Sequence, residues 1–224
     1  MDPYVYPGTR VLKNLRHIRD QGRLSRFEMD MTTRRLAEIA GSQSPGEFGA
    51  KHLQAIHRFI FQDVYGWAGE FRSVNISRPG QFPFAFSDQV QNSLNKLAGD
   101  LAKERRLAGL SQARFVKRAA RYMGELNAVH PFRDGNGRAQ REFIRVLAAR
   151  NGHALDWSRI SPGQMIEASK RSFQQGETPA SKEFCRRLSK ASGATHWSRR
   201  MEESKRRGIR ASIPGWSLIH VVNH

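Results

Sequence analysis

Apolar residues recur three and four positions apart along three stretches of the chain, which is the period of a helix with one buried face. The residues on these faces are Leu53, Ile56, Ile60 and Val64, then Phe115, Ala119, Tyr122 and Leu126, then Phe143 and Leu147. The third stretch ends at Asn151-Gly152, a typical helix stop. Helix-start patterns, in which a serine precedes Glu or Gln by three positions, occur at 25–28, 44–47 and 161–164. The sequence therefore predicts a mainly α-helical fold.

One segment departs from the helical period. Residues 71–76 alternate between apolar and polar, residues 77–81 have turn chemistry, and residues 82–86 are again mostly aromatic and apolar. We predict a short, irregular β-hairpin here, confined to an edge because its prolines cannot donate backbone hydrogen bonds. A surface loop that covers the helices is the alternative.

Towards the end of the sequence the chain becomes polar and basic. This change predicts one domain over residues 1–190 and a basic tail over residues 191–224.

Composition restricts the class of protein. The single cysteine, Cys185, excludes an internal disulfide framework and a thiolate zinc cluster. No apolar run approaches the length of a membrane span, and the first residues do not resemble a signal peptide. We expect no membrane association and a cytoplasmic location.

The charge is strongly positive. The 224 residues contain 38 Lys and Arg against 20 Asp and Glu, a formal net charge of +18. Such a balance attracts polyanions, including nucleic acids, nucleotides and acidic proteins. A basic nucleic-acid-binding protein is therefore the main non-enzyme alternative, although the sequence has no zinc-finger spacing and no RNA-binding aromatic strand. We expect nucleic acid to be a secondary partner at most.

Residues 130–141, between two predicted helices, gather several groups that carry chemistry. His130 can accept a proton near neutral pH, and Asp134 offers one hard oxygen ligand of the kind that Mg²⁺ prefers. Residues 135–137 (Gly-Asn-Gly) form a turn whose amides can bind an anion at a helix N-terminus. Arg138 and Arg141 share a face of that helix and suit a polyphosphate. Each group alone has a structural explanation, but their combination favours a nucleotide site.

This segment, HPFRDGNGRAQR, matches the pattern HPFx[D/E]GN[G/K]RxxR at every constrained position and resembles the signature of the Fic domain family. Residues 56–72 are similar to the family's helix that leads into its flap hairpin. Residues 2–9 resemble the start of small bacterial Fic toxins. The resemblance covers roughly residues 1–190 and leaves out the basic tail.

The resemblance implies a helical bundle with a β-hairpin flap that transfers AMP from ATP to a hydroxyl side chain of a protein. By this comparison His130 is the general base and Asp134 binds Mg²⁺. Gly135, Asn136 and Gly137 form the anion hole with Arg138, and Arg141 orients the γ-phosphate. Gly135 and Gly137 are typical of the AMP-transferring branch rather than the kinase-type branch, while transfer of phosphocholine or UMP, which occurs in divergent members, is left open by the motif. The flap, about residues 74–86, would hold the target by strand addition; its docking residues would be Val74, Asn75, Ile76, Phe82 and Phe84.

The resemblance also implies partners. Small toxins of this kind modify the ATPase subunits of DNA gyrase and topoisomerase IV, and an inhibitory helix with the pattern [S/T]xxxE[G/N] restrains many family members. The chain has no match to that pattern; the nearest segment, residues 198–203, has Glu203 in place of Gly or Asn. We therefore expect a separate antitoxin that supplies the glutamate. A secreted effector that modifies host proteins is the alternative role.

Overall fold

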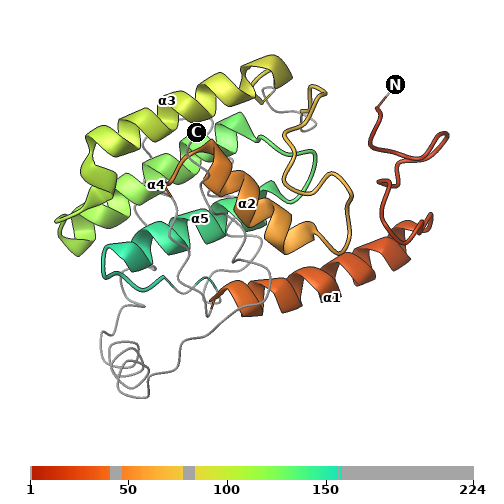
Figure 1. Ribbon diagram of the computed structural model, residues 1–224, viewed down its shortest axis with the longest axis horizontal. Coiled ribbons are helices and arrows are strands. Elements are labelled where there is room, and N and C mark those ends of the chain that lie inside the picture. The colour runs from red at the N-terminus through yellow and green to blue at the C-terminus, as the bar shows by residue number, and fades with distance from the viewer. Residues whose placement is uncertain (1, 41–46, 78–83, 156, 158–224) are drawn as a thin grey trace, which may run out of the picture. The chain divides into compact units, whose positions relative to one another are not determined.

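The computed structural model describes residues 2–40, 47–77, 84–155 and 157 (Figure 1). These described residues form α-helices and two short 3₁₀ helices, and the predicted mainly α-helical fold is confirmed. The elements are α1 Gln21–Ala40, α2 Ala50–Phe61, η1 Ser87–Gln89, α3 Val90–Lys103, η2 Arg105–Leu107, α4 Gln112–Val129 and α5 Asn136–Arg150. Within the described residues the only β pairing is an isolated bridge between Val5 and Leu12.

The core lies among α2, α4 and α5, with α2 against α5 and α1, α5 against α4, and α3 against α4 (Figure 1). The apolar positions that the helical period selected are all buried; they are Leu53, Ile56, Ile60, Val64, Phe115, Ala119, Tyr122, Leu126, Phe143 and Leu147. Phe132 is fully buried in the loop that joins α4 to α5. The apolar faces thus bring the two ends of this loop to the centre of the bundle.

The start of α1 differs from the prediction. The pattern at residues 25–28 indicated a helix start, but α1 begins at Gln21. The carboxylate of Asp20 accepts a hydrogen bond from the backbone N–H of Arg23 at 2.7 Å, which is the contact of a helix N-cap. Glu28 therefore lies inside the helix, where its side chain is available for a distant partner. The other two predicted starts fall partly or wholly outside the described residues.

The predicted β-hairpin is not observed. The segments on either side of residues 78–83, which we call the flap base (residues 71–77 and 84–86), contain no strand. The flap base is instead held by hydrogen bonds to the end of α4, including one from the N–H of Ala85 to the carbonyl oxygen of Ala128 at 3.1 Å. Residues 78–83, with Phe82, and the predicted tail at 191–224 lie outside the described residues. No helix in the described part of the chain is both long and apolar enough to cross a lipid bilayer.

Candidate active site

His130 directly follows α4 and adopts a left-handed backbone conformation, with φ of 49° and ψ of 62°. Its backbone N–H closes the helix on the carbonyl oxygen of Leu126 at 3.0 Å. The imidazole Nδ1 lies 3.3 Å from the carbonyl oxygen of Asn127, and because a carbonyl can only accept, Nδ1 carries the hydrogen. In the neutral ring this leaves the lone pair on Nε2, which is the arrangement that a proton-accepting base requires.

The amides of the predicted anion hole are not equivalent. Asn136 is buried, and its side chain bonds to both the N–H and the carbonyl oxygen of Phe132, at 2.8 and 2.7 Å. The Gly135 N–H donates to the carboxylate of Asp134 at 2.5 Å. Among the described residues nothing accepts a hydrogen bond from the N–H groups of Asn136 and Gly137, the first two residues of α5. These two amides and the helix dipole can therefore bind an anion.

Gly135 allows the sharp entry into α5. Its φ is +77°, a region that favours glycine, and a Cβ atom built on it would lie 2.3 Å from the ring of Phe61. Because Phe61 is fully buried at the end of α2, its ring has little freedom to move away. The structure thus shows why the loop has glycine at this position.

Asp134 presents a carboxylate beside this turn. The residue is exposed to solvent, yet the surrounding protein desolvates the carboxylate and raises its pKa above the usual value. The nearby Glu28 carboxylate adds to this increase, while the hydrogen bond from Gly135 opposes it. A neighbouring cation would stabilise the charged form of this desolvated carboxylate.

Arg138 is held by residues of α1. Its guanidinium lies 2.5 Å from a carboxylate oxygen of Glu28 and donates to the Thr32 hydroxyl at 3.1 Å. The Tyr65 hydroxyl donates to the other oxygen of Glu28, and the Arg138 guanidinium lies over the Phe61 ring. The sequence analysis did not identify Glu28 as a site residue. Its spacing of four from two buried residues of α1, at positions 24 and 32, could have placed it on the inward face.

Arg141 has a different environment from Arg138. Among the described residues no side chain or carbonyl group pairs with its guanidinium. Desolvation by the surrounding protein lowers its pKa, and the positive charge of Arg138 lowers it further. A Cβ atom built on Gly137 would lie 3.3 Å from Nη1 of Arg141, so this guanidinium extends back over the start of α5. Arg141 is therefore available for an anion at the same helix terminus.

His57 contacts the loop between α4 and α5 from α2. The sequence analysis did not identify it as a site residue. It is fully buried in α2; Gly69 N–H donates to its Nδ1 at 2.9 Å, so Nε2 carries the hydrogen and donates to the Asp134 carbonyl oxygen at 3.0 Å. Its ring stacks on Phe132 with centroids 3.8 Å apart. A histidine three positions before the buried Ile60 could have signalled this role. His57 thus fixes the backbone position of Asp134.

The burial of His57 makes the free energy of unfolding depend on pH. Desolvation lowers its pKa to about 4, against about 6.5 in the unfolded chain. As pH falls from 6.5 to 4, the unfolded state binds a proton that the folded state excludes, so stability decreases by about 3 kcal/mol for this group and then levels off.

We expect His57→Gln, whose amide can still donate to the Asp134 carbonyl, to reduce the loss of stability between pH 6.5 and 4, as measured by urea unfolding. His52, with its pKa also lowered to about 4 by burial, would retain its own share of the pH dependence. An unchanged pH dependence in the variant would contradict the role of His57.

One of the predicted flap residues, Phe84, contacts His130. Phe84 is buried and its ring stacks on the His130 imidazole, with centroids 3.8 Å apart and planes 12° apart. Val74 and Ile76 are half-buried and Asn75 is exposed, and Asn75 accepts a hydrogen bond from the N–H of Ser87 at 2.8 Å. Of the five predicted docking residues, the structure thus brings Phe84 against His130, while Phe82 lies outside the described residues. Their role in target docking remains a prediction.

The sequence of this chain is similar to a known family and to known proteins. Residues 47–148 match the Fic/DOC family. The probable protein adenylyltransferase y4lH of Sinorhizobium fredii is 37% identical over 188 residues, which cover 84% of this chain and 96% of that protein. Protein adenylyltransferase VbhT of Bartonella schoenbuchensis is 42% identical over 172 residues, or 77% of this chain, but the chain spans only 36% of that longer protein.

A solved structure shows the same fold. The crystal structure of the BepC effector protein of Bartonella tribocorum with bound AMPPNP is 30% identical, with a TM-score of 0.79. The similarity covers 83% of this chain and 95% of the BepC chain. The similarity to y4lH extends over almost the whole length of that protein, and residues 130–141 of this chain carry the complete motif. Both observations indicate the same family. The chain belongs to the Fic/DOC family.

Proposed function

We propose that this protein transfers AMP from ATP to a hydroxyl side chain of a target protein, with His130 as the base. The chain belongs to the same enzyme class as its curated relatives, the protein adenylyltransferases. The observation that supports the mechanism is the position of His130. Its Nδ1 hydrogen is held by the carbonyl of Asn127, and the loop that follows it leads into the first two N–H groups of α5, which have no acceptor among the described residues.

The chemical step follows from these groups. The Nε2 lone pair of His130 accepts the proton of the target hydroxyl as its oxygen attacks the α-phosphorus of ATP. A bond forms between that oxygen and the α-phosphorus, the bond from the α-phosphorus to the bridging oxygen of the β-phosphate breaks, and pyrophosphate leaves with that oxygen. The protein forms no covalent bond, so positioning and electrostatic stabilisation account for catalysis.

The phosphates would be held at the start of α5. The N–H groups of Asn136 and Gly137 bind phosphate oxygens, and Arg141 neutralises the γ-phosphate. Arg138, already paired with Glu28, contributes its charge rather than a bidentate contact. The bound AMPPNP of BepC, an analogue of ATP, supports a nucleoside triphosphate as the ligand.

The residues present fit Mg²⁺. Asp134 offers one exposed carboxylate whose pKa is raised by its surroundings, and no group of three His, Cys, Asp or Glu side chains gathers anywhere in the described residues. Mg²⁺ is commonly held in this way, by one carboxylate with phosphates and water completing its octahedron. When bound, the ion would neutralise the charge on the leaving pyrophosphate. Asp134 would hold it, and His57 would fix the backbone of Asp134.

We propose that a separate antitoxin restrains the enzyme. The guanidinium of Arg141, which pairs with no side chain among the described residues, supports this, because a glutamate bound there would compete with the γ-phosphate for the same donors. The segment nearest to the inhibitory pattern, residues 198–203, lies outside the described residues. Little change in AMP transfer by Glu202→Gly is expected if control comes from a second protein, whereas a large gain would show that the tail inhibits its own chain.

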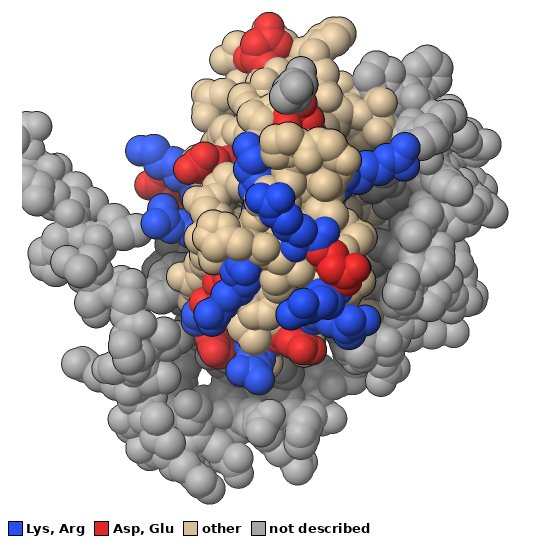
Figure 2. Space-filling model, turned by 90° about the vertical axis from the view of Figure 1, so that its right-hand side faces the viewer, with Lys and Arg blue, Asp and Glu red and all other residues tan. Residues whose placement is uncertain are grey.

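The targets that we propose, by resemblance, are the ATPase subunits of DNA gyrase and topoisomerase IV, in the bacterial cytoplasm. We propose nucleic acid only as a secondary partner. Figure 2 shows one face of the molecule on which Lys and Arg are interspersed with Asp and Glu rather than gathered into a continuous basic patch. The described part of this face therefore offers no continuous basic patch of the kind that binds a nucleic-acid backbone.

The target proposal is tested by labelling. The protein is incubated with [α-³²P]ATP, Mg²⁺ and bacterial lysate, and the labelled bands are excised and identified. We expect the ATPase subunits of gyrase and topoisomerase IV to carry the label, and a parallel reaction with His130→Ala to show about a hundredfold less or lower still. Label on other proteins, with both subunits unlabelled, would contradict the target but leave the reaction intact.

A further inference from the structure

Arg72, in the flap base, is a fully buried arginine that pairs with no carboxylate in the described residues. Its guanidinium donates only to backbone carbonyl oxygens, and burial lowers its pKa. The acceptors belong to His130 (2.9 Å), Val74 (2.7 Å), Ala85 and Val129 (3.3 Å). Burying a charge without a counter-ion costs free energy. Four carbonyl oxygens accept hydrogen bonds from this guanidinium instead, which indicates a specific structural role for Arg72.

These four carbonyls come from two separate parts of the chain. Val74 and Ala85 are the two sides of the flap base, whereas Val129 and His130 form the end of α4 and the residue after it. The backbone adds two further bonds between the same parts: the N–H of Arg72 donates to Pro131 at 2.9 Å, and the N–H of Ala85 donates to Ala128 at 3.1 Å. The flap base and the His130 loop are therefore joined through Arg72.

His130 needs such support. Its φ of 49° is a left-handed conformation that costs a residue with a side chain about 1–2 kcal/mol and that persists only where the surroundings impose it. The Arg72 Nε bond fixes the carbonyl of His130, Phe84 fixes its ring plane, and Asn127 fixes its tautomer. Two of these three contacts come from the flap base.

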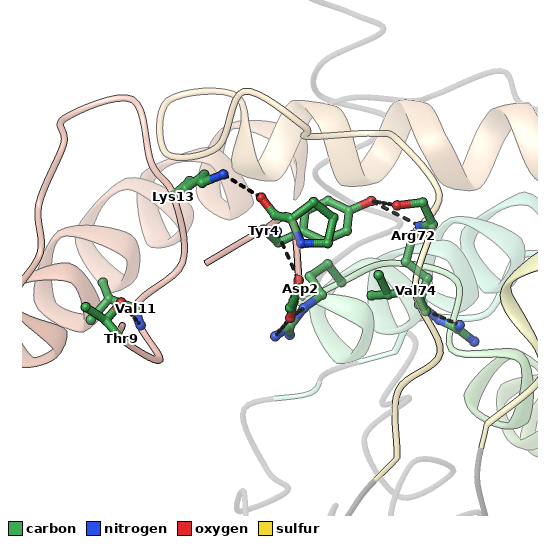
Figure 3. A network of polar contacts seen from close by, with 10 residues as sticks. Asp2, Tyr4, Thr9, Val11, Lys13, Arg72 and Val74 are labelled. Carbon is green, nitrogen blue, oxygen red and sulfur yellow. Dashed lines mark hydrogen bonds and ion pairs between the residues drawn. The ribbon is translucent and has the colours of Figure 1, made fainter. Parts of the chain in front are cut away.

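The N-terminal segment contacts the same unit from outside (Figure 3). Ser73, the residue after Arg72, donates its N–H to the Tyr4 hydroxyl oxygen at 3.1 Å. Asp2 pairs with Arg133, in the loop after His130, at 2.7 Å. Figure 3 shows the Arg72 side chain directed along the flap base toward Val74, away from Tyr4. Tyr4 therefore offers a control position next to Arg72 that does not touch His130.

We propose that Arg72 is a positioning residue for the catalytic base: it holds the backbone of His130 and the flap base as one unit. A target side chain presented by the flap then meets Nε2 of His130 in a fixed geometry. This inference rests on the proposed AMP transfer for its kinetic consequence, but the link between Arg72 and His130 can be measured without that activity.

The kinetic test uses Arg72→Lys, which keeps the charge but cannot reach four carbonyls. We expect kcat for AMP transfer to fall at least tenfold, while the Kd for AMPPNP, measured by calorimetry, changes less than threefold. The control Tyr4→Phe removes only the hydroxyl beside Ser73 and should change kcat less than threefold. A wild-type kcat in Arg72→Lys, or a loss confined to nucleotide affinity, would overturn the proposal.

Two measurements separate this inference from the proposed function. Because the Arg72 bond holds the backbone from which the imidazole reaches the Asn127 carbonyl, imidazole ¹⁵N spectra should show His130 as the Nδ1–H tautomer in the wild type and a mixture of tautomers in Arg72→Lys. Hydrogen exchange in the wild-type protein needs no variant: the amides of Arg72 and Ala85 should be protected about as well as that of His130. An unchanged tautomer in the variant, or amides of Arg72 and Ala85 that exchange as fast as that of the exposed Ser77, would refute the role of Arg72 even if AMP transfer occurs.

Discussion

Replacing His130 with alanine should reduce AMP transfer about 10²–10⁴-fold, which is the usual loss when a general base is removed. ATP affinity should stay nearly the same, because the nucleotide is held by the start of α5 and by Arg141 rather than by the imidazole. The measurement is the rate of transfer from [α-³²P]ATP together with the Kd for AMPPNP. Alanine also leaves the Arg72 bond to the His130 carbonyl oxygen in place, so the loop should keep its position.

A control for this variant is His17→Asn, which alters an exposed histidine whose backbone φ, 53°, is also left-handed. Asparagine tolerates that conformation, so neither stability nor transfer should change measurably. If His130→Ala retained near-normal transfer, the proton would have another acceptor and the mechanism would be wrong.

Gly135→Ala should have the largest effect on stability, on the order of 3 kcal/mol or more, with loss of AMP transfer in the fraction that folds. The added Cβ requires a backbone with φ of +77° and would approach the buried Phe61 ring to 2.3 Å. To relieve this overlap, either the loop or α2 must shift, and the unpaired amides of Asn136 and Gly137 would move with the loop. Urea unfolding and transfer assays measure the two effects.

Gly109→Ala provides the matched control. Gly109 has nearly the same φ, +75°, but a Cβ atom there would have no atom within 4 Å. It should therefore cost only the conformational term, about 1–2 kcal/mol. Equal losses in the two variants would show that the contact with Phe61 is not what requires glycine at position 135.

The buried faces of the helices and the loop that carries the site residues could be predicted from sequence, because both depend on local patterns. The buried faces of α2, α4 and α5 follow from apolar spacing alone, and the loop from His130 to Gly135 connects two helices as its residues indicate. The start of α1 could not be settled in this way, since Asp20 and Ser25 are both suitable caps and only the packed helix shows that Asp20 is used.

The residues that hold the site in place were missed because their contacts are distant in sequence. Glu28 reaches Arg138 across 110 positions, His57 reaches Asp134 across 77, and Arg72 reaches His130 across 58. No local pattern encodes such a pair. Asn136 shows a related limit: its place in the motif predicts a backbone N–H that binds an anion, but not the role of its side chain, which bonds to the backbone of Phe132.

The reaction is tested most directly by the position of the label on ATP. A target protein is incubated with the enzyme, Mg²⁺ and either [α-³²P]ATP or [γ-³²P]ATP, and covalent incorporation is measured after denaturation. We expect label from the α-phosphate and none from the γ-phosphate, because AMP is transferred and pyrophosphate leaves. Incorporation from γ-labelled ATP alone would mean that the enzyme is a kinase and would contradict AMP transfer.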